Sequence, residues 1–114
     1  MADIRMGPAE TQFAEIIWAN EPIASGVLSK KAEEALAWKK TTSFTVLKRL
    51  CERGLFQNQG GVVTSRISSE EYYARHSQQY VEDTFGGSLP AFIAAFGSRK
   101  KLSDSEIEEM KALI

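Results

Sequence analysis

Apolar residues recur at helical spacing in three short segments of the N-terminal half of the chain. The first segment follows Pro8, a residue type favoured at the first position of a helix, and it ends before Pro22. The second runs from about Gly26 to Ala35. The third spans residues 38–55, where apolar side chains fall on one helical face while hydroxyl and cationic groups fall on another. The pattern therefore predicts three helices joined by short connections.

The pattern changes from helical to extended after the third segment. Two runs of strand-forming residues, 55–58 and 62–67, flank the Gly60-Gly61 pair, and such a pair supplies the positive φ angles of a tight hairpin turn. Three short helices followed by a hairpin are typical of a winged helix-turn-helix, whose last helix enters the major groove of DNA. We therefore expect residues 1–67 to form a winged-helix DNA-binding domain, mainly α with a small β-hairpin.

Helical spacing returns from Ser68 to the end of the chain. Ser68 with Glu71, and Ser103 with Glu106, match the capping-box pattern that marks a helix start. Short helices with this many large apolar groups would leave much of that surface wet in a monomer, so we expect residues 68–114 to form a helical dimerisation region. The alternative is that these helices pack back on the N-terminal domain. The expected interface residues are Tyr72, Tyr73, His76, Tyr80, Phe85, Leu89, Phe92, Ile93, Phe96, Ile107, Met110, Leu113 and Ile114.

The hydroxyl and cationic face of the third segment suits contact with DNA. Threonine is costly on an exposed helix surface, so three threonines here need a reason that helix propensity does not supply. Thr hydroxyls and methyls can contact base edges, and cationic side chains can contact phosphates. We expect Thr41, Thr42, Phe44 and Thr45 to face bases, and Lys39, Lys40, Lys48, Arg49 and Arg66 to hold phosphates. The alternative is an ordinary amphipathic helix with a solvated cationic face.

Charge is unevenly distributed along the 114 residues, whose net charge is only −1. Residues 1–66 carry nine Lys or Arg against seven Asp or Glu, whereas residues 67–114 carry five against eight. The basic character therefore coincides with the candidate DNA-reading helix, while the overall balance argues against indiscriminate binding of polyanions.

Enzymatic and metal-dependent chemistry finds little support in the sequence. Cys51 and His76 are the only residues of their kinds, so no Cys or His pair exists to hold a metal, and we expect neither a metal nor a cofactor. We interpret Cys51 as a packed thiol and His76 as a core or interface imidazole, with pH sensing as its alternative. A single cysteine and the lack of an apolar run of ~20 residues favour a cytoplasmic protein. Because the sequence offers no catalytic constellation, we do not expect an enzyme.

Two groups of motifs match the pattern of one known family. The first group corresponds to a first helix, a recognition helix and the exit from that helix, and it comprises Ile16–Trp18, Trp38, Thr41–Thr42, Thr45–Leu50 and Gly54–Leu55. The second group corresponds to a dimerisation region, and it comprises Ser69–Tyr72, Phe85–Leu89, Ala94–Phe96, Leu102–Ser103 and Glu106–Glu109. In these motifs the chain resembles the penicillinase and methicillin-resistance repressors, together with the related copper-responsive repressors. The resemblance implies a homodimeric repressor that binds double-stranded DNA at an inverted-repeat operator and leaves it when an inducing signal arrives.

The resemblance also implies possible routes of induction. In antibiotic-responsive members a membrane sensor protease system triggers a cut in the segment matching residues 88–97, which places the inducing cleavage region at Ala95 and Phe96. Ala95 stands where those proteins carry Asn, which argues against this route, and the Cys-x-Cys pairs of the copper-responsive members are absent. A winged-helix scaffold that binds proteins and has lost specific DNA binding is the alternative function.

Overall fold

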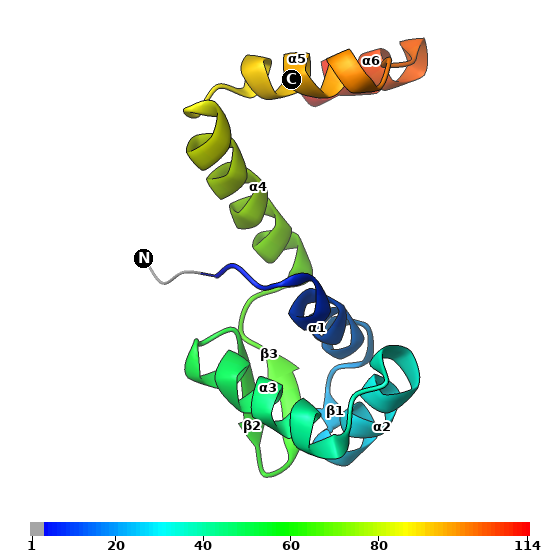
Figure 1. Cartoon of the computed structure of the whole chain (residues 1–114), viewed down its shortest axis with the longest axis vertical. Helices are drawn as coiled ribbons and strands as arrows, with labels where there is room; N and C mark the ends of the chain where they lie inside the picture. Colours follow the sequence, from blue (N-terminus) through cyan, green and yellow to red (C-terminus); the bar gives the residue numbers. More distant parts are fainter. Residues whose placement is uncertain (1–3) are drawn as a thin grey trace. The chain divides into compact units, whose positions relative to one another are not determined.

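The computed structural model describes residues 4–114, which form six helices and a three-stranded antiparallel sheet (Figure 1). The chain divides into two compact units, Met1–His76 and Ser77–Ile114. The first unit holds α1 (Pro8–Asn20), β1 (Ile23–Ala24), α2 (Ser25–Leu36), α3 (Lys40–Glu52), β2 (Phe56–Gln59), β3 (Val62–Ser65) and the start of α4 (Ser69–Phe85). The second holds the rest of α4, α5 (Leu89–Arg99) and α6 (Asp104–Leu113). The predicted fold class, mainly helical with a small β-hairpin, is confirmed.

The sheet is built on the β2–β3 hairpin, which we call the wing. Gln59 pairs with Val62 across a two-residue turn in which Gly60 and Gly61 have φ angles of 59° and 86°, values that favour glycine. β3 also pairs with β1 through Ile23 and Val63, so the strand order is β1-β3-β2. The sequence did not predict β1, because two residues are too few to show an alternating pattern.

One hydrophobic core joins the three helices of the first unit to the wing. Its fully buried large side chains are Phe13, Ile17, Leu28, Leu50, Phe56, Val63 and Tyr72. The buried positions of α3 are Ser43, Val46, Leu47 and Leu50, which is the spacing of one helical face. Because complete burial of one such aliphatic side chain is worth ~1.5–3 kcal/mol, this face holds α3 firmly and turns its opposite face outward.

The turn between α2 and α3 sets where α3 begins. Ala37 adopts a left-handed conformation with φ 57°, and its N–H donates to the carbonyl oxygen of Glu33 at 3.0 Å, which ends α2. The Trp38 ring then packs against Phe13 of α1 with centroids 5.2 Å apart. This contact anchors the entry to α3 on the core.

An aromatic joint formed by Trp18, Phe56 and Tyr72 ties the start of α4 to the first unit. The Trp18 ring centroid lies 5.6 Å from each of the other two, and the Trp18 indole N–H donates to the carbonyl oxygen of Ile67 at 3.0 Å. The N–H of Met6 donates to the Tyr72 hydroxyl at 3.3 Å. Since these contacts hold the first turns of α4, the units divide after His76, whereas the sequence placed the boundary after residue 67.

The joint also corrects one expected interface residue. Tyr72 is only 1% exposed, because its ring lies inside the core of its own chain. Its assignment to a dimer interface is therefore wrong. Tyr73 is 41% exposed, but its hydroxyl donates to a carboxylate oxygen of Glu15 in α1.

The second unit lacks an interior of its own. Tyr80, Phe85, Phe92 and Phe96 form a chain of ring contacts with centroids 5.6–6.3 Å apart, yet no residue from 77 to 114 is buried. Nearby residues in the sequence determine where its last two helices begin. Ser88 caps the N-terminus of α5, and Ser103 forms a reciprocal capping box with Glu106 at the start of α6.

Removing the hydroxyl of Ser43 should stabilise the protein. The Ser43 side chain is 3% exposed, and its oxygen has no hydrogen-bond partner. Such a group costs about 1–3 kcal/mol, so we expect Ser43→Ala to raise the free energy of unfolding by ~1 kcal/mol in urea titrations. Ser98→Ala, the same change at an exposed helical position, should alter it by less than about 0.5 kcal/mol. A Ser43→Ala variant less stable than the parent would contradict this account.

The bond between Tyr73 and Glu15 should make stability depend on pH in the alkaline range. Hydrogen bonding to the Glu15 carboxylate, with burial and the nearby negative charge, raises the pKa of Tyr73 from 10.0 to about 12. A raised folded-state pKa adds stability that is complete below the unfolded pKa and is lost as pH rises from about 10 to 12. The stability difference between the parent and Tyr73→Phe should therefore be constant near pH 8 and shrink above pH ~10.

The matched control is Tyr80→Phe, because Tyr80 contacts only aromatic rings among the interactions that the structure shows. Urea unfolding of all three proteins across this pH range makes the comparison. If the difference in unfolding free energy between the parent and Tyr73→Phe stays constant up to about pH 12, the Tyr73 phenol does not donate to Glu15.

Candidate nucleic-acid interface

The outward face of α3 is formed by Thr41, Thr45 and Lys48. All three are exposed, and they lie opposite the buried residues of the same helix. The Thr45 hydroxyl donates to the carbonyl oxygen of Thr41 at 2.8 Å, so its proton is used within the helix. Its methyl group and its oxygen lone pair are left to meet a ligand, a combination that suits a thymine methyl or a base amino group.

Phe44 and Thr42 lie on the two flanks of this face. Phe44 is half-buried, and the Lys40 ammonium lies 5.9 Å from its ring centroid, a cation–π distance. Thr42 is exposed on the flank that Arg49 shares. The structure therefore places Thr41 and Thr45 centrally and the other two predicted base-reading residues at the edges.

Three lysines give α3 its available positive charge. Lys39 and Lys40 are exposed at the first turn of the helix. Lys48 is 80% exposed and lies 4.0 Å from Glu52, one turn further on. An exposed pair of this kind contributes little stability, so Lys48 is free to exchange Glu52 for a phosphate.

Arg49 has a different setting from the lysines. Its guanidinium lies 3.6 Å from a carboxylate oxygen of Glu10 in α1, and that oxygen is buried with no hydrogen-bond partner. The other Glu10 oxygen accepts from the N–H of Gly7 at 3.2 Å. Arg49 therefore forms an ion pair between α3 and α1, while its side chain stays 55% exposed on a flank of the outward face.

Arg66 lies away from the outward face. It follows β3 at the base of the wing, where it lines a cavity with Arg53 from the C-terminal end of α3. Thr41 lies at the other end of α3, a distance of ~18 Å along the helix axis at 1.5 Å per residue. The strands and turn of the wing carry no charged residue, so the wing can offer polar contacts only.

The start of α2 is a candidate element that the sequence did not identify. The N–H of Ser25 donates to the carbonyl oxygen of Gly61 at 2.8 Å, which places the first turn of α2 beside the wing turn. The next main-chain N–H groups, of Gly26 and Val27, have no partner within the helix because they belong to its first turn, and such groups often bind phosphates. Only the pairing of β1 with β3 reveals this arrangement.

The other candidate groups, Cys51 and His76, lie where they pack against neighbouring residues. Cys51 is half-buried, and burial together with the charge of Glu52 raises the pKa of its thiol, so it stays protonated at neutral pH. The His76 ring stacks on Tyr72 with centroids 5.7 Å apart. Within residues 4–114 no three His, Cys, Asp or Glu side chains gather as metal ligands. Nor is any helix of that range both long and apolar enough to cross a membrane.

Two comparisons with known proteins agree with this architecture. The family model described as penicillinase repressor matches residues 6–114. The methicillin resistance regulatory protein MecI of Staphylococcus aureus is 21% identical over 110 residues, which cover 93% of this chain and 89% of that protein. The family resemblance read from the sequence is thereby confirmed, and the chain belongs to the penicillinase repressor family of transcriptional repressors.

Proposed function

We propose that this protein represses transcription as a homodimer that binds an inverted-repeat DNA operator through α3. The observation that carries the proposal is the two-sided character of α3. One side is packed into the core, while Thr41, Thr45 and Lys48 stand exposed on the other. A helix supported in this way after a short turn is the reading element of helix-turn-helix proteins. Membership of the penicillinase repressor family supports the same function. The similarity to MecI, which is named a regulatory protein, supports it as well.

Electrostatics predict that few phosphate contacts hold the complex together. Three lysines are exposed on this element, Lys39 at the N-cap of α3 and Lys40 and Lys48 within it, while the wing is uncharged and Arg49 is paired with Glu10. Three contacts per subunit would give a dimer a salt slope of about −5, since each neutralised phosphate contributes about −0.9. Binding of this kind depends strongly on base contacts, which favours a specific operator over random DNA.

Dimerisation through the second unit follows from its lack of a core. Its exposed large apolar side chains are Tyr80, Leu89, Phe96, Ile107, Leu113 and Ile114. Helices of 10 and 11 residues, such as α6 and α5, are marginal in water by themselves, so their order requires packing against something. A second copy related by a two-fold axis provides that packing without any other protein.

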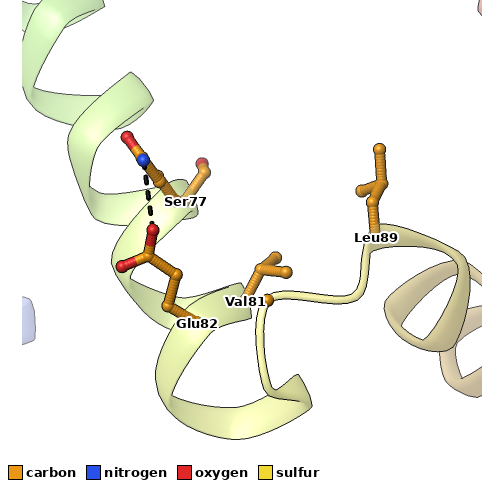
Figure 2. A pocket seen from close by; sticks show the side chains of 6 residues that line it. Ser77, Val81, Glu82 and Leu89 are labelled. Atoms are coloured by element: carbon orange, nitrogen blue, oxygen red, sulfur yellow. Dashed lines mark hydrogen bonds between the residues drawn. The ribbon is translucent and has the colours of Figure 1, made fainter.

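A cavity in the second unit offers a receptor for a side chain of the second copy. It has a volume of about 350 Å³ and lies where α4 gives way to α5. Figure 2 shows Val81 from α4 and Leu89 from α5 among the side chains that line it. Gln78 and Glu82 also line it, and the Gln78 side-chain N–H donates to a Glu82 carboxylate oxygen at 3.1 Å. An apolar side chain inserted between Val81 and Leu89 would bury both.

A protein-binding scaffold remains the second candidate function, because the wing is uncharged and Arg49 is engaged by α1. Titration with the promoter duplex upstream of the protein's own gene separates the two. Tight binding that random DNA competes poorly supports the repressor, whereas weak binding indifferent to sequence supports the scaffold.

Release by proteolysis stays a prediction from the family resemblance. Ala95 and Phe96 are exposed, but both lie inside α5, and the Ser98 hydroxyl donates to the carbonyl oxygen of Ala95 at 2.8 Å. A sensor protease would therefore have to cut a locally unfolded form of this helix.

Replacing Lys48 should weaken DNA binding uniformly across sequences. If each subunit of a dimer places Lys48 on a phosphate, Lys48→Gln removes two contacts and lowers the magnitude of the salt slope by about 2. Fluorescence anisotropy with the promoter duplex across a salt series measures this slope. Lys111→Gln is the matched control, because Lys111 is an exposed lysine of α6 paired with Glu108. An unchanged slope for Lys48→Gln would show that this side chain does not touch the DNA backbone.

A charge at Leu89 should dissociate the dimer. Leu89 is 58% exposed and lines the cavity of the second unit, so Leu89→Glu would bury an unpaired carboxylate in each half of the interface. We expect a shift from dimer to monomer in sedimentation equilibrium and at least a tenfold weaker self-association. The control is Val27→Glu in α2, where Val27 is 47% exposed. If the Leu89→Glu protein self-associates as strongly as the Val27→Glu protein, the proposed interface is contradicted.

A further inference from the structure

A second cavity lies in the first unit, at the base of the wing, and the DNA-reading face does not use it. Its volume is about 390 Å³, within the range of small-molecule sites. It is lined by Ile4, Arg53, Gly54, Leu55, Arg66, Ile67, Ser68, Glu71 and Arg75. Four separate parts of the chain therefore meet there: the N-terminal segment, the end of α3, the exit from β3 and the start of α4.

Among the described residues, the side chains that line this cavity carry more positive than negative charge. Arg53, Arg66 and Arg75 supply guanidinium groups, and Glu71 supplies a carboxylate. The Arg75 Nε lies 2.7 Å from that carboxylate, so Arg75 and Glu71 neutralise each other, and Arg66 is an exposed cation beside them. Guanidinium groups bind planar carboxylates and phosphates through paired N–H donors, which makes an oxyanion the matching ligand.

Two of these guanidinium groups contact other groups of the chain. An Arg53 Nη atom donates to the carbonyl oxygen of Arg5 at 2.6 Å, and the Arg75 Nε donates to the half-exposed Glu71 carboxylate at 2.7 Å. Arg66 is exposed, and its main-chain N–H donates to the carbonyl oxygen of Leu55 at 2.9 Å. The contacts of Arg53 and Arg75 limit the motion of these two side chains before a ligand arrives, which lowers the entropic cost of binding.

The start of α4 adds a favourable dipole. α4 is 17 residues long, and the Ser68 hydroxyl oxygen at its N-terminus accepts from the N–H of Glu71 at 3.1 Å. Ser68 and Glu71 both line the cavity. The positive end of a long helix beside these residues strengthens the preference for an anion.

We propose that this cavity binds a small free oxyanion, a carboxylate or phosphate group carried by a molecule of metabolite size. Ile67, which is only partly buried against the core, lines the cavity and can contact a short carbon body beside the charged group. A DNA phosphate is a poorer match, because Arg53 and Gly54 place the cavity at the opposite end of α3 from Thr41. The proposal goes beyond DNA binding and does not depend on it.

The test is a ¹H–¹⁵N NMR titration of the full chain with sodium phosphate and, separately, with sodium succinate. Sodium chloride keeps the ionic strength constant, because guanidinium groups also respond to bulk salt. We expect saturable shifts of the main-chain signals of Gly54, Ser68 and Ser69 with at least one anion, and the stronger of the two identifies the ligand class. No saturable shift with either anion would overturn the proposal.

Arginine variants then locate the site. Arg66→Gln and Arg75→Gln should each weaken anion binding by at least tenfold. Arg99→Gln, which removes an exposed arginine of α5, should leave it unchanged. Thermal melts establish whether each variant is folded. If Arg75→Gln is not folded, Arg66→Gln alone provides the test. Binding that survives Arg66→Gln unweakened would overturn the proposal.

Parallel DNA titrations distinguish this proposal from the proposed function. If Arg66→Gln lowers the salt slope of DNA binding and leaves the anion titration unchanged, Arg66 is a DNA contact and the cavity proposal is overturned. If phosphate or succinate saturates the cavity while no duplex binds specifically, the cavity proposal stands and the repressor proposal fails.

Discussion

The packing of Trp18 against Phe56 and Tyr72 is the contact on which the rest of the architecture depends. It joins α1, the wing and the first turns of α4, and the indole N–H secures the chain between them through the carbonyl oxygen of Ile67. Each large aromatic buries about 150–250 Å², so the joint is a large part of the core of a small unit. It decides how the winged-helix unit ends and from which point α4 continues into the second unit.

The same core determines what α3 presents outside. Burial of Val46, Leu47 and Leu50 fixes the rotation of the helix, and Arg49 adds an ion pair to Glu10 of α1. Thr41, Thr45 and Lys48 are exposed as a consequence. Ser43 is the one weak point of the inner face, because its buried hydroxyl lacks a partner.

The two units differ in how they are stabilised. The first has a closed core of fourteen buried hydrophobic residues that includes every large side chain buried in residues 4–114. The second has ring contacts and well-capped helices but no buried residue. Helix caps contribute only ~1 kcal/mol each, so they define where helices begin without supplying the burial that keeps them folded. Because of this contrast, we propose that the second unit is stabilised by self-association.

Local patterns in the sequence determined the six helices, the Gly60-Gly61 hairpin and the caps at Ser88 and Ser103, because each depends on residues within a few positions of one another. They also marked Thr41, Thr45 and Lys48 as one helical face. Tertiary structure alone decided that Tyr72 is core, that Arg49 pairs with Glu10 and that Arg66 lines a cavity with Arg53 and Arg75. The partners in those contacts are up to 66 residues apart, as with Met6 and Tyr72, and periodicity along a chain carries no information on which distant side chain will meet a given face.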